Sequence, residues 1–342
     1  MIKVSYKKTN LPFKYPFTIS KATKTHQTAL IVQLEYFGHV GYGEAPAISY
    51  YDITVEKMIE DLESKKIFVE KFSLSDPERY WHYLHHLFPK NHFLVCALDM
   101  AAWDLYGKMK KQQLHEYWGL DFADSPVTDY TIGIADTDMM IKKIKEMPWP
   151  VYKIKVGFEG DVEMVAELRK HTNAKFRVDV NGGWTADQAM QKLPFLRDAG
   201  VEIVEQPLHK EDWEGMKQLY LHSPLPLFAD ESCVSESDIV RCPHHFHGIN
   251  IKLTKCSGIT PARRMIDKAR ELDLQVMIGC MNESSLGTAA IAQLAPMADH
   301  LDMDGPLLLA EDIAEGVTFQ EGNILYREGY GLGVKVYWNE IK

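Results

Sequence analysis

Three acidic residues, each at the end of a short apolar run, recur at nearly equal spacing in the middle of the chain. Asp179, Glu205 and Asp230 are 26 and 25 residues apart, about the length of a strand, a helix and two loops. Each acid therefore ends what we predict to be the next strand. In a closed parallel barrel the strand ends converge on one face, where the three carboxylates would meet. Because they repel each other, they need a cation, and all-oxygen ligation suits a hard ion such as Mg²⁺.

Alternating strand and helix patterns surround these acids and begin after Pro126. We predict eight strands, at 128–134, 151–156, 175–180, 201–205, 226–229, 248–252, 275–279 and 300–303. We predict seven helices, at 137–146, 160–171, 185–198, 211–221, 235–240, 258–272 and 284–294. No helix clearly follows the eighth strand. This order indicates an α/β fold with a (β/α) barrel.

The first part of the chain has a different order of elements. Strand patterns at 1–8, 28–37 and 40–44 precede helical patterns at 54–65, 76–88 and 93–117. Strands followed by helices, in blocks, are typical of an α+β unit. We therefore predict an α+β domain over residues 1–120 and a barrel domain over 121–315. The Gly- and Tyr-rich tail, 316–342, is expected to return to the first domain.

The composition excludes several classes of partner. The net charge is −10 and the basic residues form no block, which argues against nucleic acid or an anionic membrane as the main partner. No apolar run is long enough to cross a bilayer, and the first ten residues alternate like a strand rather than a signal peptide. Five scattered cysteines without a Cys-x-x-Cys spacing favour free thiols and a cytoplasmic location. We expect a homo-oligomer whose order the sequence does not reveal.

Two lysines on one predicted strand are candidates for acid–base chemistry. Lys153 and Lys155 are two residues apart and point to the same side. Inside a barrel, each ammonium group would lower the pKa of the other and burial would lower it further, which would give a neutral general base near pH 7. The alternative is a solvated edge strand with exposed lysines. A further lysine, Lys252, lies on the sixth predicted strand of the barrel.

Other polar residues follow the predicted strands. Asn181 shares a side with Asp179, although an Asx-turn before the next helix would also explain the pair. Asp302 and Asp304, before Gly305–Pro306, both fall on one side of the last strand. Two acids facing a pocket suit a cationic group on a substrate, such as an amine. A turn before Gly–Pro explains them about equally well.

Taken together, these motifs resemble the enolase superfamily, in its muconate-lactonizing subgroup, and most closely its dipeptide epimerases of the L-Ala-D/L-Glu type. The Lys153–Ile–Lys155 segment resembles the Lys-x-Lys motif of that subgroup, and Lys252 resembles its sixth-strand lysine. Asp302–Met–Asp304 is similar to the Asp-x-Asp motif with which dipeptide epimerases hold the substrate's α-ammonium group. The three acids at strand ends resemble the Mg²⁺ ligands: Asp179, Glu205 and Asp230.

The resemblance implies a (β/α)₇β modified TIM barrel under an α+β capping domain. It also implies an isomerase that epimerises dipeptides, with Mg²⁺ on the substrate carboxylate and Lys155 and Lys252 moving the α-proton on opposite faces. Lys153 is expected to assist catalysis, and Asn181 and Glu231 to support the metal ligands. A cap loop near 18–28 should cover the substrate. Known members carry an arginine there, whereas this chain offers Lys21 and Lys24.

Related activities remain as alternatives. An N-acylamino acid racemase, an o-succinylbenzoate synthase or a muconate cycloisomerase-like enzyme would use the same metal and lysines but needs no ammonium site. Asp302 and Asp304 argue against these three. A non-catalytic binding barrel would be expected to have lost a lysine or a metal ligand, and all five positions are filled here.

Overall fold

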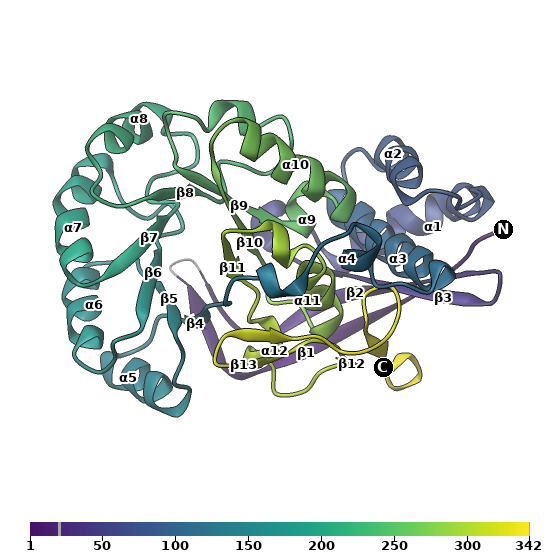
Figure 1. The fold of residues 1–342 in the computed structure, drawn as a ribbon, viewed down its shortest axis with the longest axis horizontal. Helices are drawn as coiled ribbons and strands as arrows, with labels where there is room; N and C mark the ends of the chain where they lie inside the picture. The colour runs from purple at the N-terminus through teal and green to yellow at the C-terminus, as the bar shows by residue number, and fades with distance from the viewer. Residues whose placement is uncertain (20–21, 342) are drawn as a thin grey trace.

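The computed structural model describes residues 1–19 and 22–341, and the chain forms an eight-stranded parallel barrel with an antiparallel sheet and helices at one side (Figure 1). The predicted specificity residue Lys21 lies outside the described residues. The N-terminal sheet has the order β1 (Lys3–Ile19), β2 (Ala22–Tyr36) and β3 (His39–Pro46). Its β2–β3 turn uses Phe37 and Gly38, both with positive φ, as a two-residue hairpin requires.

The first two strands are longer than the sequence pattern predicts. β1 continues to Ile19 through Pro12 and Pro16, which interrupt the alternation. The register shifts between Pro12 and Phe17, because proline has no N–H to donate to the ladder and is accommodated at edges and bulges. This extension brings β1 and β2 to the barrel, where the Thr18 carbonyl accepts the Ile134 N–H and where Phe17 and Lys24 line a cavity.

Helices pack on this sheet and complete the N-terminal unit. They are α1 (Val55–Lys71), α2 (Pro77–Leu87), α3 (His92–Lys110) and the short α4 (Leu114–Tyr117). The prediction of one helix over 93–117 is wrong. The left-handed conformation of Lys111 ends α3, and a capping box between Gln113 and Glu116 starts α4. Gly43 lets β3 approach α3, since a Cβ there would lie 1.9 Å from the carbonyl oxygen of Ala97.

The barrel strands are all parallel and follow one another in chain order, which confirms the predicted fold class. An isolated β-bridge between Thr128 and Leu301 connects the segment just before the first barrel strand to the last barrel strand. The strands are β4 (Tyr130–Ile132), β5 (Val151–Lys155), β6 (Lys175–Asp179), β7 (Val201–Glu205), β8 (Leu227–Ala229), β9 (Gly248–Lys252), β10 (Gln275–Gly279) and β11 (His300–Asp302).

Helices cover the outside of the barrel, with one departure from the prediction. The larger ones are α5 (Thr137–Glu146), α6 (Asp161–Arg169), α7 (Ala186–Asp198), α8 (Trp213–His222), α10 (Ile259–Glu271) and α11 (Ser285–Ala292). The predicted helix at 235–240 is only the 3₁₀ turn η3 (Ile239–Arg241). The Asp238 carboxylate there accepts from the backbone of Val234 and Ser235, and such local side-chain bonds compete with helix formation.

The remaining elements are short. α9 (Leu253–Cys256) follows β9, and α12 (Gly305–Leu308) follows β11. In the tail, β12 (Ala314–Glu315) pairs with β15 (Lys335–Val336), and β13 (Thr318–Gln320) pairs with β14 (Asn323–Leu325). The tail meets the N-terminal unit where Leu332 N–H donates to Asp104 of α3 at 3.0 Å. The domain limits at 120 and 315 stay predictions.

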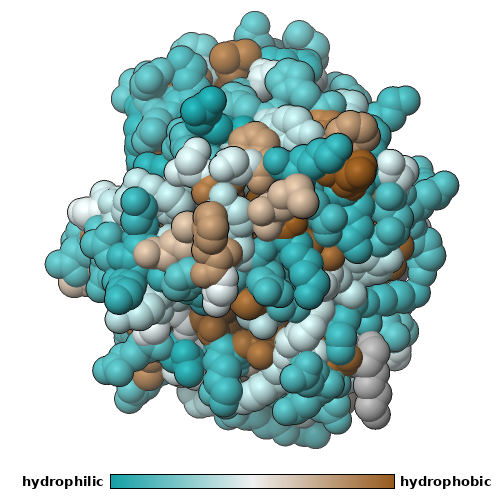
Figure 2. All heavy atoms as spheres, turned by 90° about the vertical axis from the view of Figure 1, so that its right-hand side faces the viewer, coloured by the Kyte–Doolittle hydropathy of each residue, from teal (hydrophilic) through white to brown (hydrophobic). Residues whose placement is uncertain are grey.

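The surface and the helices add two observations about possible partners. The face on the right-hand side of Figure 1 is largely hydrophilic, with apolar side chains in small separate groups (Figure 2). Among the described residues, none of the helices has both the length and the apolar character that a membrane span needs.

Candidate active site

The three evenly spaced acids meet at the carboxyl end of the barrel. Asp179 and Glu205 end β6 and β7 and are register partners, and Asp230 directly follows β8. All three are buried, and one carboxylate oxygen from each lies within 4.8 Å of the others. Parallel strands of a barrel end on one face, so three acids that are far apart in the sequence lie close together in the structure.

This cluster fits a hard divalent cation. It offers only carboxylate oxygens, the donors that Mg²⁺ prefers. Burial, followed by the charge of Asp179, raises the pKa of Glu205 to about 7, so the protein alone does not fully compensate the cluster's negative charge. Burial acts to raise the pKa of Asp179 as well, but the ammonium groups of Lys155 and Lys153 hold it at about 2. A bound cation would offset the remaining repulsion.

The predicted lysines lie among these acids. Lys155 Nζ is 2.6 Å from Asp179 Oδ2, and Lys252 Nζ is 2.8 Å from Asp230 Oδ2. Lys153 Nζ lies 2.6 Å from Asp302 Oδ2 and 2.7 Å from Glu205 Oε2. The exposed fractions of Lys153 and Lys155 are 2% and 8%, so the alternative of a solvated edge strand is wrong.

The expected lowering of the lysine pKa is also wrong for Lys153. Burial acts to lower the pKa of Lys153, but the charges of Asp302, Glu205 and other carboxylates raise it well above its ordinary value. Burial likewise acts to lower the pKa of Lys252, and Asp230 raises it. The carboxylates lie in direct contact with the ammonium groups, and opposite charges at this distance outweigh the repulsion between lysines.

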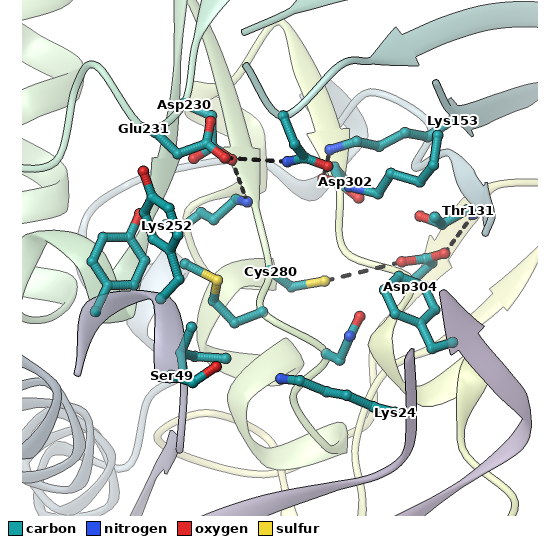
Figure 3. A pocket seen from close by; sticks show the side chains of 18 residues that line it. Lys24, Ser49, Thr131, Lys153, Asp230, Glu231, Lys252, Cys280, Asp302 and Asp304 are labelled. Carbon is teal, nitrogen blue, oxygen red and sulfur yellow. Dashed lines mark hydrogen bonds and ion pairs between the residues drawn. The ribbon is translucent and has the colours of Figure 1, made fainter. Parts of the chain in front are cut away.

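Asp302 ends β11 and Asp304 follows it, and both side chains line the cavity (Figure 3). Asp302 is paired with Lys153. Asp304 Oδ2 accepts the Thr131 N–H at 2.6 Å, and its Oδ1 lies 4.0 Å from the Cys280 thiol. Burial and the neighbouring charge of Asp302 raise the pKa of Asp304 to about 7. Asp304 therefore lacks the full compensation that Lys153 gives to Asp302, and it suits a cationic ligand.

The two expected supporting residues contact each other beside the acid cluster. The backbone N–H of Asn181 donates to Asp179 Oδ1 at 3.0 Å, and its side-chain amide donates to Glu231 Oε1 at 3.2 Å. The other Glu231 oxygen is buried without a hydrogen-bond partner within the described part of the chain. Burial and the charge of Asp230 raise the pKa of Glu231. Asn181 thus connects the loops that follow β6 and β8.

These groups surround a cavity of about 320 Å³ between the N-terminal unit and the barrel mouth. Lys24 of β2 extends toward it from the N-terminal strands (Figure 3). Its Nζ donates to Gln27 Oε1 at 3.1 Å, and burial lowers its pKa. No carboxylate of the described residues forms an ion pair with Lys24. The other lining residues of the N-terminal unit are Phe17, Ile48, Ser49, Tyr50 and Tyr51.

The sequence patterns did not identify three residues that hold the acidic side chains of the cluster in position. Buried Lys255 donates to Asp230 Oδ1 at 2.6 Å and to the Asp230 carbonyl at 2.7 Å. Asn250 donates to Glu205 Oε1 at 2.9 Å. Gln206 accepts the N–H of Asp230 through its side-chain oxygen at 3.0 Å. The only available signal was the placement of Asn250 two residues before Lys252, on the same side of one strand.

Comparison with known proteins agrees with this geometry. Residues 1–119 match the mandelate racemase/muconate lactonizing enzyme N-terminal domain, and residues 139–340 match the enolase C-terminal domain-like family. An L-Ala-D/L-amino acid epimerase of Flavobacterium johnsoniae is 47% identical over 333 residues, which cover 97% of this chain and 99% of the relative.

Two solved structures have the same fold over nearly the whole chain. A substrate-liganded complex of the L-Ala-D/L-Glu epimerase from Bacillus subtilis has a TM-score of 0.92 at 28% identity and covers 98% of each chain. A dipeptide epimerase from Cytophaga hutchinsonii, complexed with Mg and the dipeptide D-Ala-L-Val, has a TM-score of 0.92 at 26% identity. It covers 99% of this chain and 96% of its own. The chain therefore belongs to the enolase superfamily, in the mandelate racemase/muconate lactonizing enzyme family, and is an isomerase.

Proposed function

We propose that the protein is a Mg²⁺-dependent dipeptide epimerase that inverts the α-carbon of the C-terminal residue by a two-base proton transfer. The observation that carries this proposal is the position of the two lysines. Lys155 ends β5 and Lys252 ends β9, which are four strands apart in an eight-stranded barrel. They therefore approach the cavity from opposite sides, with the acid cluster between them in strand order.

The metal ligands in this proposal are Asp179, Glu205 and Asp230. When bound there, Mg²⁺ would act as a Lewis acid on the substrate carboxylate and stabilise the second negative charge that forms when the α-proton leaves. The chain's own residues prepare this site. Lys255, Asn250 and the other positioning residues hold the carboxylates in place, and burial excludes water from the reacting groups.

The lysines then carry the proton. In one direction, neutral Lys155 takes the α-proton and becomes an ammonium group, while the ammonium group of Lys252 gives a proton to the opposite face and becomes neutral. The reverse reaction uses the same groups with exchanged roles. One proton enters and one leaves, so the substrate changes configuration without a net gain or loss. Lys153, which touches three carboxylates, serves to balance their charge.

The same cavity offers an anionic group for the amine of the dipeptide. Asp302 and Asp304 supply this charge, and Asp304 is the less compensated of the two. Carboxylates that accept from an ammonium group form strong charge-assisted hydrogen bonds. The N-acylamino acid racemase, o-succinylbenzoate synthase and cycloisomerase alternatives have no such ammonium group to bind, so this pair favours dipeptides.

The side chain of the second residue would lie toward the N-terminal unit. Lys24 supplies a positive charge there that forms no ion pair with an acid in the described part of the chain, which favours an acidic residue such as Glu. Aromatic and apolar side chains also line this side, among them Phe17, Ile48 and Tyr51. We therefore propose L-Ala-L-Glu as the leading substrate, within a range that includes dipeptides with neutral second residues.

The experiment that tests the proposal compares free and N-acetylated dipeptides. Incubation in D₂O with Mg²⁺ should exchange the α-hydrogen of the second residue for deuterium, with inversion. Acetylation of the amine should reduce kcat/KM about tenfold or more, because it leaves buried carboxylates unpaired. Equal kcat/KM for the two forms would contradict the ammonium site and favour the N-acylamino acid racemase alternative.

A further inference from the structure

Glu44 is a buried carboxylate from the N-terminal sheet that binds the barrel. It lies on β3 with no exposed surface, and β3 packs against α11 of the barrel (Figure 1). Its Oε1 accepts the Ser284 N–H at 3.0 Å, and its Oε2 accepts the Gly287 N–H at 3.1 Å. The Ser284 hydroxyl donates to the same carboxylate. A residue 240 positions away thus binds two N–H groups at the start of α11, those of Ser284 and Gly287, at a helix end where backbone N–H groups lack partners within the helix. The two N–H groups between them have other partners, because Ser285 donates to Asp312 and Leu286 donates to the Ser284 hydroxyl.

Each segment next to this contact leads to a wall of the cavity. On the N-terminal side, β3 ends at Pro46, and Ile48 and Tyr51 follow as lining residues. On the barrel side, Met281 and Asn282 line the cavity, and only Glu283 separates them from Ser284. The Glu44 carboxylate therefore lies where the two walls join.

Neighbouring contacts make this connection stiff. Glu283 Oε2 accepts the Met281 N–H at 2.6 Å, so the barrel wall is held by the residue next to Ser284. Gln27 donates to the Ala47 carbonyl at 2.8 Å, and its oxygen accepts from Lys24. Small errors in the position of a binding wall are costly for catalysis, so an exact separation of these segments matters for substrate binding.

We propose that Glu44 is a positioning residue for the isomerase reaction: through Ser284 and Gly287 it sets the distance between the cavity wall at 48–51 and the cavity wall at 280–282. It touches no substrate. Its loss should loosen both walls together and weaken substrate binding, while the lysines and metal ligands, which lie on other strands, keep their chemistry.

The first test replaces Glu44 by Gln, whose NH₂ group cannot accept the N–H bonds of α11. With the proposed dipeptide substrate, KM should rise about tenfold, as expected for a lost hydrogen bond to a charged group, with kcat within about threefold of wild type. Ser284→Ala should raise KM in the same direction, and the double variant should add little more, because both changes remove one contact. Glu70→Gln is the matched control, since Glu70 accepts the Val4 N–H at 3.1 Å inside the N-terminal unit.

The second test needs no activity and therefore separates this inference from the proposed function, on which the kinetic test rests. Hydrogen exchange of Glu44→Gln should become faster at residues 47–51 and 281–289 and stay unchanged in β1, β2 and α3. Unchanged exchange in these two segments, or an equal increase throughout the chain, would overturn the inference, as would an unchanged KM. If Glu44→Gln does not fold, Ser284→Ala alone decides by the same criteria. A wild type without dipeptide activity would refute the proposed function and leave the exchange test valid.

Discussion

Lys155 and Asp179 are register partners on neighbouring strands, and their side chains meet with 2.6 Å between Nζ and Oδ2. Across the barrel, Lys252 makes the equivalent contact with Asp230 at 2.8 Å. A candidate base thus touches a candidate metal ligand on each side of the cavity. Because of this pairing, changes to either partner affect the charge of the other, and the variants below are chosen to separate their roles.

We predict that loss of one of the proposed metal ligands weakens cation binding. Asp230→Asn removes one of three negative ligands and should weaken Mg²⁺ binding by at least about tenfold, since even the loss of an outer partner of a metal ligand commonly costs ~10–100-fold. Isothermal titration calorimetry measures the change. Asp238→Asn, in the turn after β8, should bind Mg²⁺ like the wild type, and an unaltered affinity of Asp230→Asn would rule out this ligand.

The two lysines predict a dependence on substrate configuration. Lys155→Ala should stop α-deuterium exchange from one epimer, and Lys252→Ala from the other, each by about 10²–10⁴-fold, the usual contribution of a positioned acid or base. Proton NMR in D₂O follows each epimer separately. Lys170→Ala, on the exposed surface beyond α6, is the control. Wild-type rates from both epimers in either variant would exclude the two-base mechanism.

Lys24 predicts a preference that depends on the second residue of the dipeptide. Lys24→Met removes a charge that has no acidic partner in the described structure, so kcat/KM for L-Ala-L-Glu should fall by up to about fivefold, the range of a partly solvated ion pair. The value for L-Ala-L-Leu should stay constant or rise. The ratio of the two kcat/KM values is the measurement, and a constant ratio would place the acidic side chain elsewhere.

We predict that buried Asp99 makes the free energy of unfolding decrease as the pH rises. Burial raises its pKa from 3.8 to about 7, against hydrogen bonds from Thr260. The folded state therefore holds this proton between about pH 4 and 7 while the unfolded state releases it. The contribution to stability is complete below pH 4 and is lost as the pH rises toward 7, by at most roughly 1.4 kcal/mol per pH unit.

Urea unfolding between pH 5 and 8 measures this slope. Asp99→Asn cannot ionise, and the free energy of unfolding of this variant should decrease less steeply with pH than that of the wild type. Asp198→Asn, an exposed acid at the end of α7, should keep the wild-type slope. Identical slopes for Asp99→Asn and wild type would show that Asp99 does not retain its proton.

The order of the barrel strands and the convergence of the acids were predictable from the chain alone. Apolar runs of strand length alternate with helical patterns, and a parallel barrel places every strand end on one face. The local errors have local causes. Lys111 takes a left-handed conformation inside an otherwise helical pattern, and the polar turn at Asp238 replaces a helix. Periodicity does not register such side-chain and backbone contacts.

The sequence by itself determined the fold class and the convergence of the three acids, because strand periodicity and spacing carry that information. The opposed roles of Lys155 and Lys252 were implied by the resemblance to the superfamily. Only the tertiary structure decided the electrostatics and the closing contacts. The pKa of Lys252 depends on a carboxylate 22 residues away and that of Lys153 on one 149 residues away, and the contact from Glu44 to Ser284 spans 240 residues. Charge interactions depend on distance in space, and a sequence without its fold does not specify those distances.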